Sequence, residues 1–155
     1  MTGRYWPVTD LLPHTGLAVL LDEVITCNDT GLSACVTIGS DSAFHQHDGV
    51  PAHVGIEYMA QACGAFSGAS ALRSGKTPCV GFILGTRRYL ATRAWFADGE
   101  RLVVTVDLVY RDEEIGVFDC LISSGGEMVA KSQLIVAEPK NVADLISRQS
   151  GTDDE

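Results

Sequence analysis

A long apolar segment with a single acidic residue constrains the fold of this chain more than any other feature. Residues 54–72 read Val-Gly-Ile-Glu-Tyr-Met-Ala-Gln-Ala-Cys-Gly-Ala-Phe-Ser-Gly-Ala-Ser-Ala-Leu, and Glu57 is the only charged side chain among them. Because the segment has no polar face, we expect a helix buried on all sides rather than one lying on a surface. Small residues recur four apart at Ala60, Gly64 and Gly68, which lets another element approach this stripe closely.

The carboxylate of Glu57 needs an explanation, because burying a charge is costly unless the charge has a partner or a function. One interpretation is that Glu57 complements the positive end of the helix dipole. The other is that it acts chemically, since acids in unusual surroundings are common in active sites. The residue pattern alone leaves both interpretations open.

Segments that favour strands flank the helix on both sides. Before it, residues 16–26 alternate loosely, and a turn at residues 28–31 leads to a second strand at 32–38. After it, extended segments are expected at 78–84, 87–96, 102–110, 115–123 and 128–137. This order predicts an α+β domain in which a curved antiparallel sheet wraps around one long buried central helix at about 54–72.

The chain is expected to form a single domain over residues 1–139, followed by a partly disordered tail at 140–155 with a short surface helix at 142–148. No apolar run reaches the length of a membrane span without interruption, and the N-terminus lacks the apolar core of a signal peptide. Five cysteines without a Cys-x-x-Cys pair indicate free thiols, so a reducing cytoplasm is the expected location.

Charge is distributed unevenly along the sequence. The formal net charge is −9, which argues against nucleic acid as a partner. Between Tyr58 and Ala97 there is no acidic residue, yet basic residues are frequent there. These basic residues are Arg73, Lys76, Arg87, Arg88 and Arg93. They could form a docking surface for a phosphate-bearing or acidic partner, or they could be solvated separately.

Several motifs resemble one enzyme family. The segments 11–14, Leu-Leu-Pro-His, and 20–24, Leu-Leu-Asp-Glu-Val, look like the start of the beta-hydroxyacyl-carrier-protein dehydratases of fatty acid synthesis. Residues 57–62, Glu-Tyr-Met-Ala-Gln-Ala, resemble the Glu-x-Met-Ala-Gln-Ala helix of that family. Residues 82–89 resemble one of its later strands, and residues 96–102 resemble its Pro-Gly-Asp-x-Leu turn.

The resemblance spans nearly the whole chain, from Leu11 to about Glu138. Residues 50–61 together with residues 81–89 are most similar to one branch, the dehydratase-like hot-dog proteins of aryl polyene and related polyketide-like clusters. The resemblance therefore implies a hot-dog fold. It also implies elimination of water from a 3-hydroxyacyl thioester, with the substrate carried on the phosphopantetheine of an acyl carrier protein and no further cofactor.

The same resemblance assigns roles to residues of the helix. Elimination needs a base for the α-proton and an acid for the leaving hydroxyl, and Glu57 matches the acid of the family. Gly55 lies at the helix N-terminus, where backbone N–H groups could hold the thioester carbonyl without a side chain in the way. Gln61, one turn after Glu57, could orient Glu57 or a water, or it could bond a neighbouring backbone group.

The base is harder to assign, because the family's His-Phe-Pro-Gly loop would place its histidine at Ala43. The chain instead has histidines at 45 and 47, and His53 lies four residues before Glu57. We predict that His45 is the base, with His47 and His53 as alternatives, and each has the plain alternative of an exposed loop residue. The spacing of these histidines matches no familiar zinc pattern, so no metal site is predicted.

Three functions follow from the sequence. The first is an active 3-hydroxyacyl-carrier-protein dehydratase in fatty acid or polyene biosynthesis. The second is a non-catalytic hot-dog subunit that supports an active partner, and the third is an acyl thioesterase. The expected partners are an acyl carrier protein and a second hot-dog subunit, identical or related, because family members share the active site across a dimer interface.

Overall fold

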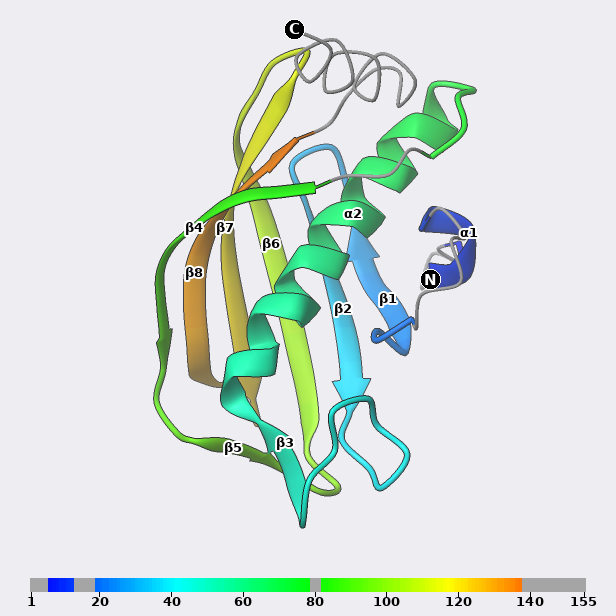
Figure 1. Ribbon diagram of the computed structural model, residues 1–155. Coiled ribbons are helices and arrows are strands. Elements are labelled where there is room, and N and C mark those ends of the chain that lie inside the picture. Colours follow the sequence, from blue (N-terminus) through cyan, green and yellow to red (C-terminus); the bar gives the residue numbers. More distant parts are fainter. Residues whose placement is uncertain (1–5, 13–18, 79–81, 138–155) are drawn as a thin grey trace, which may run out of the picture.

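The expected central helix is present in the computed structural model, which describes residues 6–12, 19–78 and 82–137. The helix is α2, Gly55–Arg73, and a single 3-10 turn, Ala52–Val54, precedes it without a break. It crosses one face of an antiparallel sheet diagonally (Figure 1). Among the described residues, the other α-helix is the short α1, Val8–Leu11, which the sequence did not predict.

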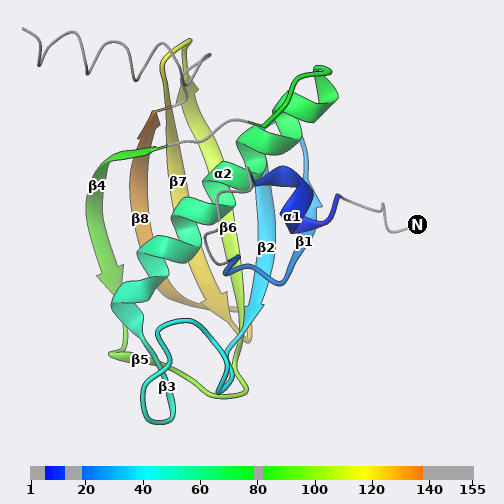
Figure 2. The ribbon, with the colours of Figure 1, turned by 45° about the vertical axis from the view of Figure 1, so that its right-hand side comes forward.

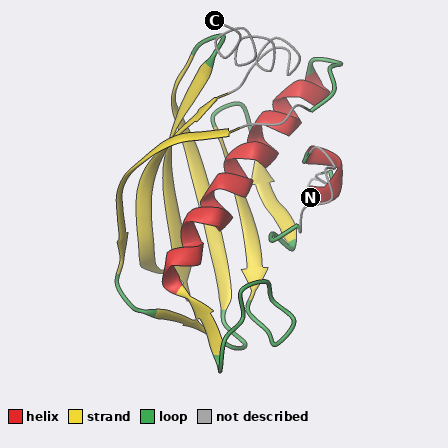
Figure 3. Ribbon diagram, viewed as in Figure 1, coloured by secondary structure: helices red, strands yellow, loops and turns green. Residues whose placement is uncertain are grey.

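The sheet has six strands in the order β1-β2-β6-β7-β8-β4. Their bounds are β1 Glu23–Cys27, β2 Gly31–Thr37, β4 Phe82–Ala91, β6 Arg101–Arg111, β7 Ile115–Ser124 and β8 Glu127–Ala137. A small second sheet pairs β3, Gly49–Pro51, with β5, Trp95–Ala97. Figure 2 shows both helices on the same face of the large sheet, and Figure 3 shows that strands make up most of the remaining structure. The predicted α+β arrangement is therefore confirmed.

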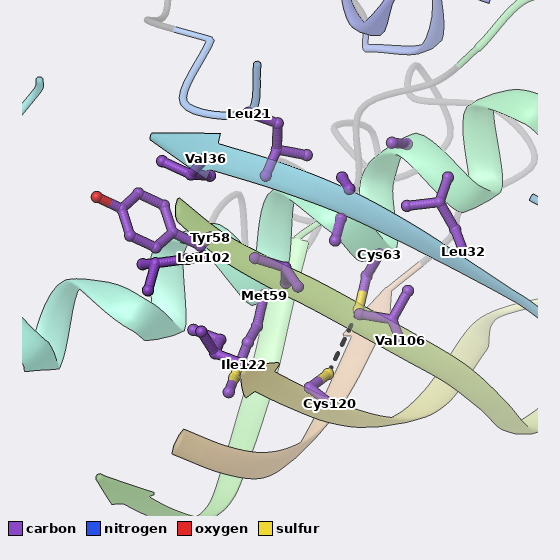
Figure 4. Packing of buried hydrophobic residues seen from close by; sticks show 14 of the residues in the cluster. Leu21, Leu32, Val36, Tyr58, Met59, Cys63, Leu102, Val106, Cys120 and Ile122 are labelled. Atoms are coloured by element: carbon purple, nitrogen blue, oxygen red, sulfur yellow. Dashed lines mark hydrogen bonds between the residues drawn. The ribbon is translucent and has the colours of Figure 1, made fainter. Parts of the chain in front are cut away.

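Apolar side chains fill the space between α2 and the sheet. Tyr58, Met59 and Phe66 of α2 are almost completely buried, and Phe66 packs edge-on against Phe118 of β7. The thiols of Cys63 and Cys120 lie 3.8 Å apart in this layer (Figure 4). The alternation of buried and exposed residues along β6, β7 and β8 explains this packing, because every second side chain points toward the helix.

The expectation that the helix is buried on all sides is wrong for the single chain. The sheet covers the side that carries Gly55, Tyr58 and Met59, whereas Ile56 is half-buried and Glu57 is exposed. The side of α2 that the sheet leaves uncovered consists mainly of small and apolar residues, including the half-buried Ala60. For this reason the helix shows no polar face in the sequence. Such a side leaves apolar surface in water, which is typical of a region that a partner covers.

The stripe of small residues on α2 admits α1, as the four-residue spacing indicated. A Cβ atom added at Gly68 would lie 2.7 Å from the backbone carbonyl carbon of Leu11, and one at Gly64 would lie 3.3 Å from Cδ2 of Leu12. Leu11 is fully buried and Val8 is 5% exposed. The two helices therefore approach closely only because glycine occupies position 68.

Two extended segments expected after the helix, at 78–84 and 87–96, have different bounds in the structure. They form one long strand, β4, and the short β5, and the register of β4 against β8 shifts between Arg87 and Leu90. Arg88 lies in this bulge with a φ angle of 50°. The expected tail at 140–155, with its helix at 142–148, falls outside the described residues. Within the described residues, no helix is long and apolar enough to cross a membrane.

Candidate functional site

The candidate site is the start of α2, where Glu57 lies in the first turn of the helix. Its side chain is exposed in the single chain, and within the described residues it makes neither a hydrogen bond nor an ion pair. The position at the N-terminal end of a 19-residue helix places the carboxylate near the positive end of the helix dipole. Glu57 is therefore accessible to a substrate or to a second subunit.

The three histidines lie around this end of the molecule in different settings. Nε2 of His45 lies 2.8 Å from Oδ1 of Asp98, so His45 joins its loop to the turn between β5 and β6. The ring of His47 packs edge-on against Trp95 of β5, with centroids 6.4 Å apart. His53 is exposed in the 3-10 turn before α2. Within the described residues, no hydrogen bond joins any of the three to Glu57.

Tyr89 is a residue of this end that the sequence analysis missed. Its hydroxyl donates a hydrogen bond to the carbonyl oxygen of Ala52, at the beginning of the helical run. Burial, together with nearby Tyr58, raises the pKa of Tyr89 to about 12, so the hydroxyl stays protonated and continues to donate. The bulge at Arg88 turns Tyr89 toward the helix, and no sequence pattern signals a positive φ at an arginine.

The same tyrosine explains why residue 55 is glycine. A Cβ atom added at Gly55 would overlap the Tyr89 hydroxyl and would lie 3.0 Å from Cδ1 of Ile122. The N–H of Gly55 already bonds to the carbonyl of Ala52 within the 3-10 turn. Gly55 is buried, so its missing side chain makes room for Tyr89, and its contact with substrate stays a prediction.

Gln61 connects the helix to the segment before β1. Its side-chain oxygen accepts hydrogen bonds from the N–H groups of Leu20, at 2.7 Å, and Leu21, at 3.2 Å. This is the backbone-bonding alternative that the sequence left open. Orientation of Glu57 or of a water by Gln61 stays a prediction.

Glu100 anchors the turn that carries Asp98. Burial alone would raise the pKa of this carboxyl, but hydrogen bonds from the Ser124 hydroxyl, the Ala97 N–H and the Arg93 guanidinium outweigh burial and lower it. The Arg93 contacts measure 2.7 and 2.6 Å. The carboxylate is therefore ionised and holds β5 in place beside the start of α2.

The five basic residues expected to form a docking surface are distributed over separate elements. Arg73 ends α2 and pairs with Asp29, and Arg93 pairs with Glu100. Lys76 follows the helix, whereas Arg87 and Arg88 lie in β4. The structure therefore gathers only Arg87 and Arg88, which are neighbours in the chain.

We predict that Tyr89→Phe destabilises the start of α2. The variant loses the hydrogen bond to Ala52, which is worth about 1 kcal/mol, and leaves the packing at Gly55 almost unchanged. Urea denaturation measures the loss. Tyr110→Phe is the matched control, because its hydroxyl bonds Asp112 at 2.9 Å in an exposed position, where the loss should be smaller. Equal effects in both variants would contradict an anchoring role for Tyr89.

Residues 6–147 match the model of the ApeP-like family, described as ApeP dehydratase. The dehydratase heterocomplex ApeI:P from Xenorhabdus doucetiae contains a similar chain, with 32% sequence identity and a TM-score of 0.86 over 93% of this chain and 97% of that chain. No curated protein sequence matches this chain.

More distant solved structures share only the hot-dog fold. A hypothetical thioesterase protein with coenzyme A from Streptococcus pneumoniae is 13% identical, with a TM-score of 0.60 over 74% of this chain and 83% of that chain. The PaaI protein of Escherichia coli is 15% identical, with a TM-score of 0.58 over 74% of this chain and 81% of that chain. The fold expected from the sequence resemblance is thus confirmed.

Proposed function

The chain belongs to the ApeP-like dehydratase family, and on this premise we propose that it takes part in eliminating water from a 3-hydroxyacyl thioester carried on an acyl carrier protein. The observation that carries the proposal is the exposed carboxyl group of Glu57 at the start of α2. No described residue of the chain forms a hydrogen bond or an ion pair with this group. A carboxylic acid with this access can reach a hydroxyl group on a bound substrate.

In the proposed reaction, a base removes a proton from C2 of the acyl chain, and the electron pair forms the C2–C3 double bond. The hydroxyl leaves C3 with a proton from Glu57, so the products are water and a 2-enoyl thioester. Covering the site with a second subunit would expel water from around the reacting groups. Loss of the proton from the base and uptake of a proton by Glu57 then restore the starting state.

A second candidate is a supporting subunit that needs another chain to complete the site. It is favoured by the arrangement of the histidines, because His45 bonds to Asp98 and no hydrogen bond or ion pair joins a described histidine to Glu57. In this reading, Glu57 faces a base supplied by a second hot-dog subunit. His45, His47 and His53 remain the candidates for a base within this chain.

The second subunit would have two surfaces available. One is the uncovered side of α2, with Ile56 and Ala60 beside Glu57. The other is the edge of β4, which within the described residues pairs only with β8 and exposes Ile83 and Leu84. Long edge strands with exposed apolar residues tend to pair with another chain. The partner of the similar chain in the ApeI:P heterocomplex is consistent with a related subunit here.

The carrier protein would bind through charge, because carrier proteins are acidic. Of the five residues predicted for docking, Arg73 and Arg93 pair with carboxylates of this chain, which leaves Lys76, Arg87 and Arg88, all exposed. Such contacts mainly affect the association rate and its dependence on salt.

The proposal is tested by incubating the purified chain with a 3-hydroxyacyl carrier protein and following the carrier by mass spectrometry. A mass decrease of one water, together with enoyl thioester, supports an active dehydratase. Enoyl product only after a related hot-dog subunit is added supports the supporting-subunit candidate. Release of free carrier protein indicates thioester hydrolysis and contradicts both.

A further inference from the structure

The outer face of the large sheet, opposite α2, carries an ordered row of charges. Strand register places four residues side by side, with Asp107 of β6 opposite Asp119 of β7, Asp119 opposite Gln133 of β8, and Gln133 opposite Arg87 of β4. Neither helix covers this face (Figures 1 and 2). The row therefore has carboxylates at one end and a guanidinium at the other.

A hollow of about 600 Å³ lies over this row. On the side of β4 and β8, it is lined by Arg87, Arg88 and Lys131. On the side of β6 and β7, it is lined by Asp107 and Asp119. A simple anion site is unfavourable here, because two carboxylates would face the bound anion. An occupant with charges of both signs in the opposite order fits the hollow better.

The two carboxylates are not neutralised within the described residues. Like charges directly opposite each other in an antiparallel pair are destabilising. Asp119 accepts a hydrogen bond from Nε2 of Gln133 at 3.0 Å, and Asp107 leans over Gly31, where an added Cβ would lie 2.8 Å from its Oδ1. Arg87 is three strand spacings from Asp107, or about 14 Å, which is too far for an ion pair.

We propose that this outer face binds the outer face of a second copy of the chain. A two-fold axis parallel to the strands and between β7 and β8 reverses the order of the row. It therefore places Asp107 opposite the partner's Arg87 and Asp119 opposite the partner's Gln133. Lys131, two residues along β8 from Gln133, then lies diagonal to the partner's Asp119.

Apolar residues beside the charged row add to the same interface. Leu121 of β7 and Leu90 of β4 are 38% and 55% exposed, and the register places both in the next row along the strands. About this axis, only the four strands β6, β7, β8 and β4 overlap with strands of the partner. At about 4.8 Å spacing and about seven residues in length, they give a face of roughly 440 Å². Two such faces bury roughly 900 Å², which is in the range of weak, transient association.

This contact is separate from the chemistry at Glu57 and from pairing through the β4 edge or the uncovered side of α2, but it uses Arg87, which is also a candidate for carrier docking. It leaves Glu57 accessible, because α2 lies on the other side of the sheet (Figure 2). A chain that pairs through the outer face and also through the β4 edge or α2 would form an assembly of two dimers.

The test is a charge swap, followed by sedimentation velocity over a range of protein concentrations. Arg87→Asp and Asp107→Arg should each weaken self-association by at least about ten-fold, because each places like charges opposite each other. The double variant Arg87→Asp with Asp107→Arg restores the complementarity and should regain most of the affinity. Lys76→Asp, which makes the same change of charge beyond the end of α2, should have no effect.

Three outcomes would overturn the proposal. The wild-type chain could stay monomeric at about 100 μM, although an interface of this size is expected to associate in that range. The single reversals could leave self-association unchanged, which would point to the β4 edge or α2 instead. The double variant could fail to recover while Arg87→Asp weakens carrier binding, which would make the outer face a carrier surface.

Discussion

Turnover of a 3-hydroxyacyl carrier protein should fall by about 10²- to 10⁴-fold when Glu57 is replaced by glutamine, the usual contribution of a general acid. Glutamine has nearly the same shape but cannot deliver the proton that the leaving hydroxyl needs. The fold should be unaffected, because Glu57 is exposed and no described residue bonds to it. The rate of enoyl formation under single-turnover conditions measures the loss of turnover. The midpoint of urea denaturation shows whether the fold is unaffected.

Glu127→Gln provides the matched control. Glu127 is an exposed glutamate at the start of β8, so the same substitution there should leave turnover and stability unchanged. If the reaction requires a second hot-dog subunit, the Glu57→Gln chain is assayed together with wild-type partner. Turnover that persists in both arrangements would show that Glu57 is not the acid.

Much of the fold could be predicted from local patterns. Three of its features depend only on residues close together in the sequence: the apolar segment at 54–72, the alternation along β6 to β8 and the turn before β2. The helix and the strands after it were therefore expected. The short helix α1 was missed, because four residues carry too little periodicity to indicate a helix. Burial of α2 was overestimated, because an apolar sequence does not show whether a helix face is covered by the same chain or by a partner.

The site was predictable only in part, because its chemistry depends on contacts distant in sequence. Glu57 stood out as a lone charge, whereas the bond between Tyr89 and Ala52 spans 37 residues and depends on a backbone bulge. Gln61 illustrates the same limit, since its partners Leu20 and Leu21 are about forty residues away. The family resemblance assigned the acid to Glu57, and the preference for His45 over His47 and His53 as the base stays a prediction.

The second prediction with a large expected effect concerns stability. Glycine is replaced by alanine at two positions of α2, 68 and 64, and the two variants are compared. Gly68→Ala places a Cβ atom against the backbone of Leu11, which cannot rotate away as a side chain can. Helix α1 must then separate from α2, which exposes Leu11 and Val8. Losing the burial of these side chains costs about 1.5–3 kcal/mol each, whereas the better helix propensity of alanine returns only about 1 kcal/mol.

Gly64→Ala should behave differently, although it lies one turn away on the same stripe. Its Cβ would lie 3.3 Å from the end of the Leu12 side chain, which can shift by a few tenths of an ångström. We therefore expect Gly64→Ala to change the unfolding free energy by no more than about 1 kcal/mol, and Gly68→Ala to lower it by about 2–5 kcal/mol. Urea denaturation of both variants measures the difference. Equal stability would mean that α1 does not pack on Gly68, and that the four-residue stripe serves another surface.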